Sequence, residues 1–407
     1  VEKTRTATDR KSLAALLEHH LSVALQPSSL VVYVETSDGR LSAITGDLTP
    51  ESNTILASEP FLLEVAQNGQ PSEFPHNADT QAPMALARLQ PECLVPILGR
   101  ESKLLGLVVL GMRLSEEPYS TEDKHLLAAV ASQAGIALES IRLAENIAKR
   151  LEAERRSAQE LEFARQVQTR LLPQKLPAMK TLQYTGACIP ARTVGGDYYD
   201  FLELRPGRLG MVLADIAGKG VPGALLMANL QANLRSQYAM AIDDLPRVLA
   251  SVNRLFYQST DPASYATLFF ADYDDATGLL RYANCGHLPP LLVRAAANPL
   301  HQHSGKSSAH WLAPTSTVLG LFEEWQCQIA EVTLAAGDTL VLYTDGITEA
   351  TGDDEEEFGE ERLLESVANQ NQLAPVELLD ALVTSVRQFS RGEQQDDITL
   401  VVARCAS

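Results

Sequence analysis

Four short segments of the sequence place an aspartate where an apolar stretch meets a turn. They are Gly195-Gly196-Asp197-Tyr198, Leu213-Ala214-Asp215-Ile216-Ala217-Gly218, Tyr343-Thr344-Asp345-Gly346 and Gln395-Asp396-Asp397-Ile398. A single Asp-Gly is usually a turn. If the fold gathers all four segments, however, their mutual repulsion is costly unless cations fill the cluster. Hard divalent cations prefer oxygen ligands, and pairs of them serve phosphate-ester hydrolysis. The pattern therefore raises the hypothesis of a two-metal phosphatase.

The neighbouring apolar stretches suggest how these aspartates meet. Asp215 and Asp345 each follow a predicted strand, and Asp396 and Asp397 precede one at 398–402. If these strands are neighbours in one sheet, with the last antiparallel to the others, all the carboxylates fall at one end. Asp197 enters through Gly195-Gly196, where the backbone can approach closely or take a positive φ. Asp200 either joins the cluster or caps a local turn.

The composition is typical of a globular protein, and the net charge argues against some classes of binding partner. It has 407 residues, 45% of them hydrophobic, and a net charge of −19. This charge argues against nucleic acid or an anionic membrane as the main partner. The five dispersed cysteines indicate reduced thiols in a cytoplasmic protein. No apolar run approaches the roughly 20 residues that a membrane span needs.

The first part of the chain reads as a sensor-sized domain followed by a rod. We expect a domain at 1–140, with buried strands at Leu30–Val34 and Leu104–Leu110 and a helix that Ser120 or Thr121 caps. This helix continues without Gly or Pro to Leu171, which predicts a linker helix at 141–172. A thin apolar seam favours a two-stranded coiled coil, hence a homodimer, over a solvated single helix. The seam consists of Leu143, Ile147, Leu151, Ala158 and Leu161.

Residues 173–407 read as a second domain of mixed α and β structure. Short turns join several of the strand candidates, which favours mainly antiparallel sheets. The candidates are Leu209–Asp215, Tyr265–Asp272, Leu279–Ala283, Leu291–Val293, Cys327–Leu334, Thr339–Thr344 and Ile398–Ala403. Helices are expected at 222–238, 245–258 and 375–389. Strand runs interrupted by helix pairs suggest a sandwich with helices packed outside. The fold class expected for the whole chain is α+β.

Six ordered motifs resemble the SpoIIE/RsbU branch of the metal-dependent PPM protein phosphatases. The motifs are Val194–Phe201, Ala214–Pro222, Ala283–His287, Tyr343–Ala350, Phe358–Leu363 and Asp396–Thr399. The approach Ala164–Gln168 and Leu171-Leu172-Pro173 also matches. Residues 1–140 resemble a GAF sensor domain, mainly through Tyr119–Asp123 and the helix after it.

The resemblance implies a fold, a cofactor and a set of site residues. The fold is an αββα sandwich, with two Mn²⁺ or Mg²⁺ ions at one end of the paired sheets. Asp215 is implied to bridge the two metals, and a metal-bound water, rather than a protein nucleophile, attacks the phosphorus. The Ile216 carbonyl and Asp197 are implied to serve one metal, with Asp345 and Asp396 on the other. Asp397 lies in the same motif and is included among the candidate ligands.

Two further residues invite a functional interpretation. Arg192 lies five residues before Asp197, where an arginine grips the substrate phosphate in some relatives of this family. A guanidinium suits that contact, and a structural salt bridge is the alternative. His287 is expected to shape the turn at Gly286–Pro290 rather than to act as a general acid.

We therefore predict a cytoplasmic protein serine/threonine phosphatase. The resemblance implies a phosphoserine or phosphothreonine substrate on a bacterial signalling protein, such as an anti-sigma-factor antagonist in a partner-switching system. The sensor domain is expected to regulate it through the coiled coil. The alternative is a catalytically weak module that binds a signalling partner. A nucleotide cyclase is disfavoured, because Tyr198-Tyr199 follows Gly195-Gly196-Asp197 where a cyclase needs Glu-Phe.

Overall fold

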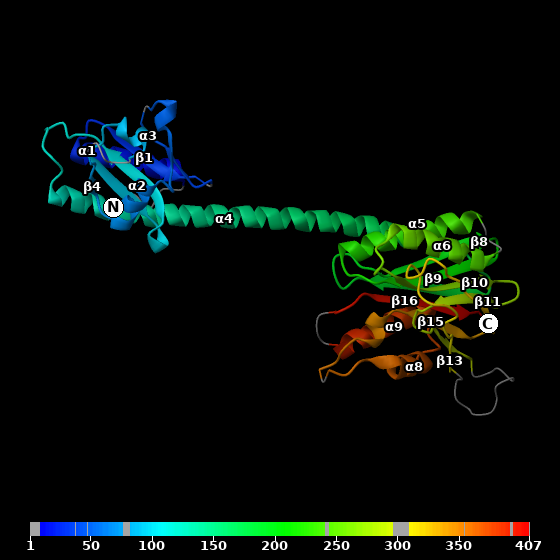
Figure 1. Cartoon of the computed structure of the whole chain (residues 1–407). Coiled ribbons are helices and arrows are strands. Elements are labelled where there is room, and N and C mark those ends of the chain that lie inside the picture. Colours follow the sequence, from blue (N-terminus) through cyan, green and yellow to red (C-terminus); the bar gives the residue numbers. More distant parts are fainter. Residues whose placement is uncertain are drawn as a thin grey trace. The chain divides into compact units, whose positions relative to one another are not determined.

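The computed structural model describes residues 9–36, 38–46, 48–75, 82–240, 244–295, 309–353, 355–390 and 394–406. The chain divides into two compact units, Val1–Arg156 and Ser157–Ser407. The helix α4 (Thr121–Leu171) contributes to both. Figure 1 shows this helix and the sheets of each unit.

The first unit is built on a six-stranded antiparallel sheet. Its strand order is β3-β2-β1-β6-β5-β4. Its centre is formed by β1 and β6, where Val32 pairs with Val108. Strand β6 is buried along its whole length, as its unbroken apolar sequence requires. The strands are β1 (Leu30–Glu35), β2 (Arg40–Ala43), β3 (Thr54–Leu56), β4 (Ser72–Glu73), β5 (Cys93–Leu98) and β6 (Leu104–Leu110).

Helices cover both faces of this sheet. On one face, α1 (Arg10–Leu25) and the first turns of α4 bury leucines and alanines against β1, β5 and β6. On the other face, α2 (Pro60–Asn68) and α3 (Met84–Ala87) pack over a second apolar cluster. Short 3₁₀ turns lie at Pro50–Ser52 and Arg100–Ser102.

The predicted N-terminal cap of α4 is confirmed. The Ser120 hydroxyl accepts the backbone N–H of Asp123 at 3.1 Å, and the Asp123 carboxylate accepts the Ser120 N–H at 2.9 Å. This reciprocal arrangement satisfies N–H groups that the first helical turn leaves without partners. It fixes where the helix starts after the sheet.

Helix α4 is also the one described helix long and apolar enough by composition to suit a membrane span. A third of its most apolar window is buried in the protein. Leu127, Ala131, Ala134 and Leu138 lie in the core of the first unit. A single helix of this kind is weak evidence for a membrane, because a core helix has the same composition.

The second unit contains two five-stranded antiparallel sheets. The first has the order β14-β11-β10-β9-β8, and the second has the order β13-β12-β15-β16-β7. The first sheet comprises β8 (Tyr198–Arg205), β9 (Arg208–Ile216), β10 (Ala266–Asp274), β11 (Leu279–Cys285) and β14 (Ala330–Thr333). The second comprises β7 (Leu182–Ile189), β12 (Leu291–Val293), β13 (Ala309–Trp311), β15 (Thr339–Tyr343) and β16 (Ile398–Cys405).

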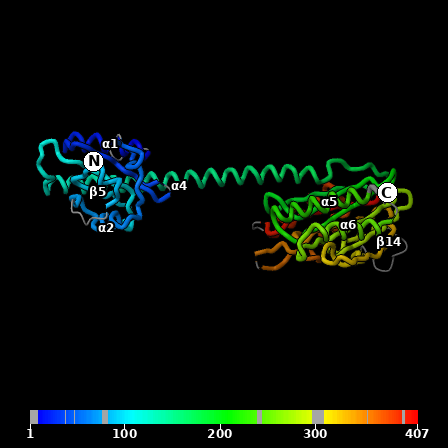
Figure 2. Tube along the Cα trace, turned by 45° about the horizontal axis from the view of Figure 1, so that its top comes forward, coloured from blue at the N-terminus to red at the C-terminus, as the bar shows by residue number. Residues whose placement is uncertain are grey.

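The two sheets pack face to face, and helices cover their outer faces. Residues of both sheets, among them Leu213, Phe269, Leu342 and Val401, share one buried cluster. Helices α5 (Val221–Met240) and α6 (Leu245–Ser259) cover the first sheet, and Figure 2 shows both on the second unit. Helices α8 (Gly359–Asn369) and α9 (Pro375–Ser390) cover the second. This arrangement is the expected αββα sandwich.

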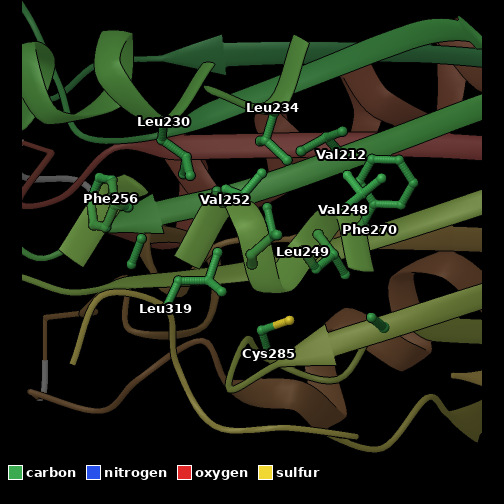
Figure 3. Close-up of a cluster of buried hydrophobic side chains, with 14 of the residues drawn as sticks. Val212, Leu230, Leu234, Val248, Leu249, Val252, Phe256, Phe270, Cys285 and Leu319 are labelled. Carbon is green, nitrogen blue, oxygen red and sulfur yellow. The ribbon is translucent and has the colours of Figure 1, made fainter. Parts of the chain in front are cut away.

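The outer core over the first sheet explains the spacing of α6. Val248, Leu249, Val252 and Phe256 recur at helical intervals and are buried. Figure 3 shows them facing Val212, Phe270 and residues of α5. Burying such side chains contributes roughly 1.5–3 kcal/mol each. This packing holds α5 and α6 against the strand that ends at Asp215 and Ile216.

One expectation about the strands is wrong. The strands that carry Asp215 and Asp345 do not belong to one sheet: β9 lies in the first sheet, whereas β15 and β16 pair in the second. The aspartates come together because two stacked sheets end at the same edge of the sandwich. The sequence pattern identified the strands but did not reveal which sheet each joins.

Candidate metal centre

The acidic segments meet where the two sheets end. Asp215 is the penultimate residue of β9, Asp345 opens the short helix α7 (Asp345–Thr348) directly after β15, and Asp396 and Asp397 precede β16. Asp197 precedes β8. One cleft is lined by Asp215, Asp396 and Asp397 together with Gly196, Lys219 and Arg192.

The carboxylates raise one another's pKa. Burial, then the charges of Asp345, Asp396 and Asp397, raise the pKa of Asp215 to about 7. Burial and the nearby Asp215 raise the pKa of Asp197 well above its usual range. Burial and Asp396 raise the pKa of Asp345. These directions reflect negative charge held out of water without enough compensating positive charge.

Two threonines hold the Asp197 carboxylate. The hydroxyl of Thr344, between β15 and α7, donates to Asp197 Oδ2 at 2.8 Å, and the hydroxyl of Thr399 in β16 donates to the same oxygen at 2.5 Å. The other carboxylate oxygen has no part in these two bonds. Sequence analysis missed both threonines, although each lies two residues or fewer from a motif aspartate.

Asp397 ties the glycine segment to the start of β16. Its Oδ1 accepts the N–H of Ala191 at 2.8 Å, and its Oδ2 accepts the N–H of Gly196 at 2.9 Å. A Cβ on Gly195 would lie 1.9 Å from Asp397 Oδ2, and one on Gly346 would lie 2.1 Å from the Asp397 carbonyl oxygen. Glycine is therefore needed at positions 195 and 346, because the loops that carry them approach the Asp397 loop too closely for a side chain.

Gly196 is needed for a further close approach. A Cβ there would lie 2.8 Å from the Ile216 carbonyl oxygen. Neither Gly195 nor Gly196 has a positive φ, so of the two reasons for glycine expected from the sequence, close approach is the one that applies. The Ile216 carbonyl therefore lies beside the loop that leads to Asp197.

Lys219 is a basic group that the sequence analysis passed over. Its ammonium lies 2.6 Å from Asp396 Oδ2, in an ion pair that is partly exposed. Arg192 lines the same cleft, and among the described residues no carboxylate forms an ion pair with its guanidinium. Among the described residues, nothing therefore supports the alternative that Arg192 forms a structural salt bridge.

Asp200 does not join the cluster. Its carboxylate accepts two bonds from Arg235 of α5, at 2.8 and 3.0 Å, and one from the Tyr198 hydroxyl at 2.6 Å. Asp200 is fully buried, so this pairing offsets its desolvation. Its role is to bind α5 to β8.

The donor types fit hard divalent cations. Several carboxylates and a backbone carbonyl converge, and Mn²⁺ and Mg²⁺ favour such oxygen ligands. In the described ranges, however, no three Asp, Glu, His or Cys side chains are arranged closely enough to form a ligand set. Asp396 is paired with Lys219, and both Asp397 oxygens accept backbone N–H groups.

Comparison with known protein families gives one match within each of the two compact units. Residues 205–406 match the family model described as Stage II sporulation protein E (SpoIIE), and residues 11–138 match the model described as GAF domain.

Two curated proteins are similar to the chain. Phosphoserine phosphatase RsbU of Bacillus subtilis is 29% identical over 253 residues, which cover 60% of this chain and 70% of that protein. Protein IcfG of Synechocystis sp. is 29% identical over 269 residues, covering 60% of this chain and 41% of that protein. The chain therefore spans less than half the length of IcfG.

A solved structure shows the same fold. The SiaA-PP2C domain of Pseudomonas aeruginosa matches with a TM-score of 0.53 at 22% identity, covering 62% of this chain and 98% of that domain.

Proposed function

We propose that the chain is a protein serine/threonine phosphatase that hydrolyses phosphoserine or phosphothreonine with divalent metals. The proposal is supported by the match of residues 205–406 to the SpoIIE family model and by the similarity to phosphoserine phosphatase RsbU. The match of residues 11–138 to the GAF model supports a sensor domain before it. The observation that carries this proposal is the convergence of acidic segments from two sheets at one edge of the sandwich. Their raised pKa values mark a site with excess negative charge.

In this proposal the acidic residues share two Mn²⁺ or Mg²⁺ ions. Asp215 would serve both, with Asp197 and the Ile216 carbonyl on one side and Asp345 and Asp396 on the other. When bound, such ions lower the pKa of water and neutralise charge on phosphate oxygens. Thr344 and Thr399 orient Asp197, and Asp397 is proposed to hold the Gly195-Gly196 loop as well as to lie within reach of the metals.

Arg192 is proposed to bind the substrate phosphate. Its guanidinium lines the same cleft as Asp215 and Asp396 and is exposed to solvent. A guanidinium can donate two parallel hydrogen bonds to a phosphate. Hydrolysis then forms a bond from a water oxygen to phosphorus and breaks the bond to the serine or threonine oxygen, which leaves with a proton.

We further propose that the connector helix regulates this site. Within the second unit, the Gln168 side chain of α4 donates to the Gly195 carbonyl at 2.7 Å and accepts the Gly195 N–H at 3.2 Å. Gln231 of α5 donates to the Leu171 carbonyl at 3.4 Å. A shift of α4 would thus act both on the loop that leads to Asp197 and on α5, which follows the Asp215 loop.

A homodimer through α4 is part of the same proposal. Leu143, Ile147 and Leu151 are 50%, 58% and 53% exposed, at helical spacing on one side of α4. A second copy of the helix would cover this seam. The proposed substrate is a cytoplasmic signalling phosphoprotein, such as an anti-sigma-factor antagonist, whose dephosphorylation switches its partner.

Metal-dependent turnover tests the enzymatic proposal. The full chain is expected to release phosphate from p-nitrophenyl phosphate and from a phosphoserine peptide with Mn²⁺ and not with EDTA. Asp215→Asn should lower kcat by at least about 100-fold, because it removes the carboxylate proposed to serve both ions. Asp380→Asn, at an exposed position of α9, is the matched control.

Two results would overturn this proposal. One is a folded wild-type chain without Mn²⁺-dependent turnover on either substrate, which would favour the non-catalytic signalling module. The other is equal turnover by wild type and Asp215→Asn.

A further inference from the structure

His287 is a buried residue to which the proposed reaction gives no task. It lies after β11 of the first sheet, on the segment that crosses to β12 of the second. Only 3% of its surface is exposed. It belongs to the Ala283–His287 motif, and the sequence analysis expected His287 itself only to shape the turn at Gly286–Pro290.

The imidazole bridges the two sheets. Its Nδ1 lies 2.7 Å from the Thr267 hydroxyl in β10, and its Nε2 lies 3.1 Å from the Tyr343 carbonyl at the end of β15. A carbonyl oxygen can only accept, so Nε2 carries the proton and Nδ1 accepts from Thr267. Burial lowers the pKa of His287 to about 4, so the ring is neutral at pH 7.

Each end of this bridge adjoins a proposed metal residue. Thr267 is the cross-strand partner of Asp215, and its hydroxyl lies 3.5 Å from the Asp215 carbonyl oxygen. Tyr343 directly precedes Thr344, which binds Asp197, and Asp345 follows. One side chain therefore connects β10, which pairs with the strand bearing Asp215, to the end of β15, which leads to Asp345.

The position of His287 is itself fixed. Its backbone N–H donates to Asn284 Oδ1 at 2.9 Å. Asn284 is fully buried and donates its side-chain amide to the Leu312 carbonyl at 3.2 Å. Gly286 supplies the φ of +66° that the intervening turn needs. These bonds hold the backbone at His287, and with it the imidazole, in one position between the two sheets.

We propose that His287 is a positioning residue that sets the separation of the Asp215 and Asp345 segments, and thereby the affinity for divalent metal. The inference rests on the proposed function, because it concerns the same metal centre. Residues behind the ligands commonly change metal affinity by about 10- to 100-fold when they are altered. As a neutral group, His287 also adds no positive charge that would repel a cation.

Two substitutions at Thr267 test the hydrogen bond between Thr267 and His287 without leaving a cavity in the core. Thr267→Val removes the hydroxyl that binds Nδ1 and keeps the branched shape, whereas Thr267→Ser keeps the hydroxyl. Isothermal titration of the full chain with Mn²⁺ is expected to give a Kd about tenfold weaker for Thr267→Val. Thr267→Ser should stay within about twofold of wild type.

A double variant tests whether the two residues act together. His287→Asn combined with Thr267→Val should bind Mn²⁺ no more weakly than His287→Asn alone, because both changes break one connection. Thermal unfolding in EDTA shows how much of each effect is general destabilisation. At saturating Mn²⁺, the KM for the phosphoserine peptide should be unchanged in Thr267→Val.

A measurement on the unaltered chain keeps the test independent of folding. Selective ¹⁵N-histidine labelling is expected to show a His287 Nε2–H signal that shifts when Mg²⁺ saturates the centre. The inference is overturned if that signal does not move, or if Thr267→Val binds Mn²⁺ as tightly as Thr267→Ser. If the wild-type chain itself fails to bind Mn²⁺, the proposed function fails instead.

Discussion

At the scale of single residues, the acidic cluster is held together against its own repulsion. Asp197 receives two hydroxyl donors, Asp397 two backbone N–H groups and Asp396 the ammonium of Lys219. None of these contacts involves the Asp215 carboxylate, whose pKa is raised to about 7. Substitution of Asp215 should therefore show most directly how much the repulsion among these carboxylates lowers the free energy of unfolding.

Asp215→Asn should change the pH dependence of stability in EDTA. The ordinary pKa of this carboxyl is 3.8, and the folded value is about 7. Between these values the folded chain holds a proton that the unfolded chain has lost, so this residue's contribution to stability falls as pH rises and levels off above pH 7. The advantage of Asp215→Asn over wild type should grow with pH by at most about 1.4 kcal/mol per unit. Urea unfolding between pH 5 and 8 measures it, and a constant difference would contradict this reading.

Lys219→Met is expected to strengthen metal binding. Lys219 pairs with Asp396 and adds positive charge beside the cluster, so it opposes a divalent cation. The pair is partly exposed, which limits the gain to roughly two- to fivefold in the Kd for Mn²⁺. Calorimetric titration of the variant and of Lys175→Met, at an exposed position outside the cleft, gives the comparison. Weaker binding by Lys219→Met would mean that Lys219 supports the metal centre.

At the scale of elements, the metal centre depends on loops that interlock through glycines. The residue types at Gly195, Gly196 and Gly346 were visible in the sequence, but the atoms they approach were not. Strands β9, β10, β12, β15 and β16 follow their apolar runs closely. Strands β7, β8 and β13 were missed. In β8 the polar residues Asp200 and Glu203 interrupt the apolar pattern. Register and sheet membership depend on long-range pairing, which a local pattern does not encode.

The contact between α4 and the Gly195 loop gives a prediction for the connector. Gln168→Ala removes two hydrogen bonds to the Gly195 backbone, worth roughly 1 kcal/mol in all. The Kd for Mn²⁺ should weaken by about fivefold, with turnover falling most at low Mn²⁺. Gln166→Ala, two residues earlier and exposed, should match wild type. If both variants bind Mn²⁺ with the same affinity, the contact between α4 and the Gly195 loop does not influence metal binding.

At the scale of the whole molecule, one continuous helix connects the part of the chain that matches the GAF model to the sandwich that matches the SpoIIE model. The sequence predicted this order of parts and the αββα layering, because both follow from helix and strand periodicity and from ordered motifs. The limits proposed for the parts, 1–140, 141–172 and 173–407, stay a prediction. The contact-based division falls inside the helix, at Arg156 and Ser157.

The seam on α4 predicts the oligomeric state. Ile147→Glu together with Leu151→Glu places charge on two apolar positions that are 58% and 53% exposed. Light scattering of the full chain should give twice the chain mass for wild type and the single chain mass for this variant. Arg150→Ala is the control on the same helix. A wild-type chain that is monomeric at micromolar concentration would refute the dimer.

Removing the sensor tests whether the parts communicate. A chain that lacks residues 1–140 should differ from the full chain in its Mn²⁺ requirement or its turnover, because the connector would no longer carry the state of the first unit. Its oligomeric state is measured in parallel. Unchanged kinetics together with an unchanged mass would count against regulation through α4.

The location of bound metal tests the central claim most directly. Crystals of the full chain grown with Mn²⁺, measured near the manganese absorption edge, should give anomalous peaks between Asp215 and the carboxylates of Asp197, Asp345 and Asp396. Asp215→Asn crystals should lose at least one of these peaks. Manganese bound elsewhere in a catalytically active chain, with no peak at this edge of the sandwich, would contradict the account.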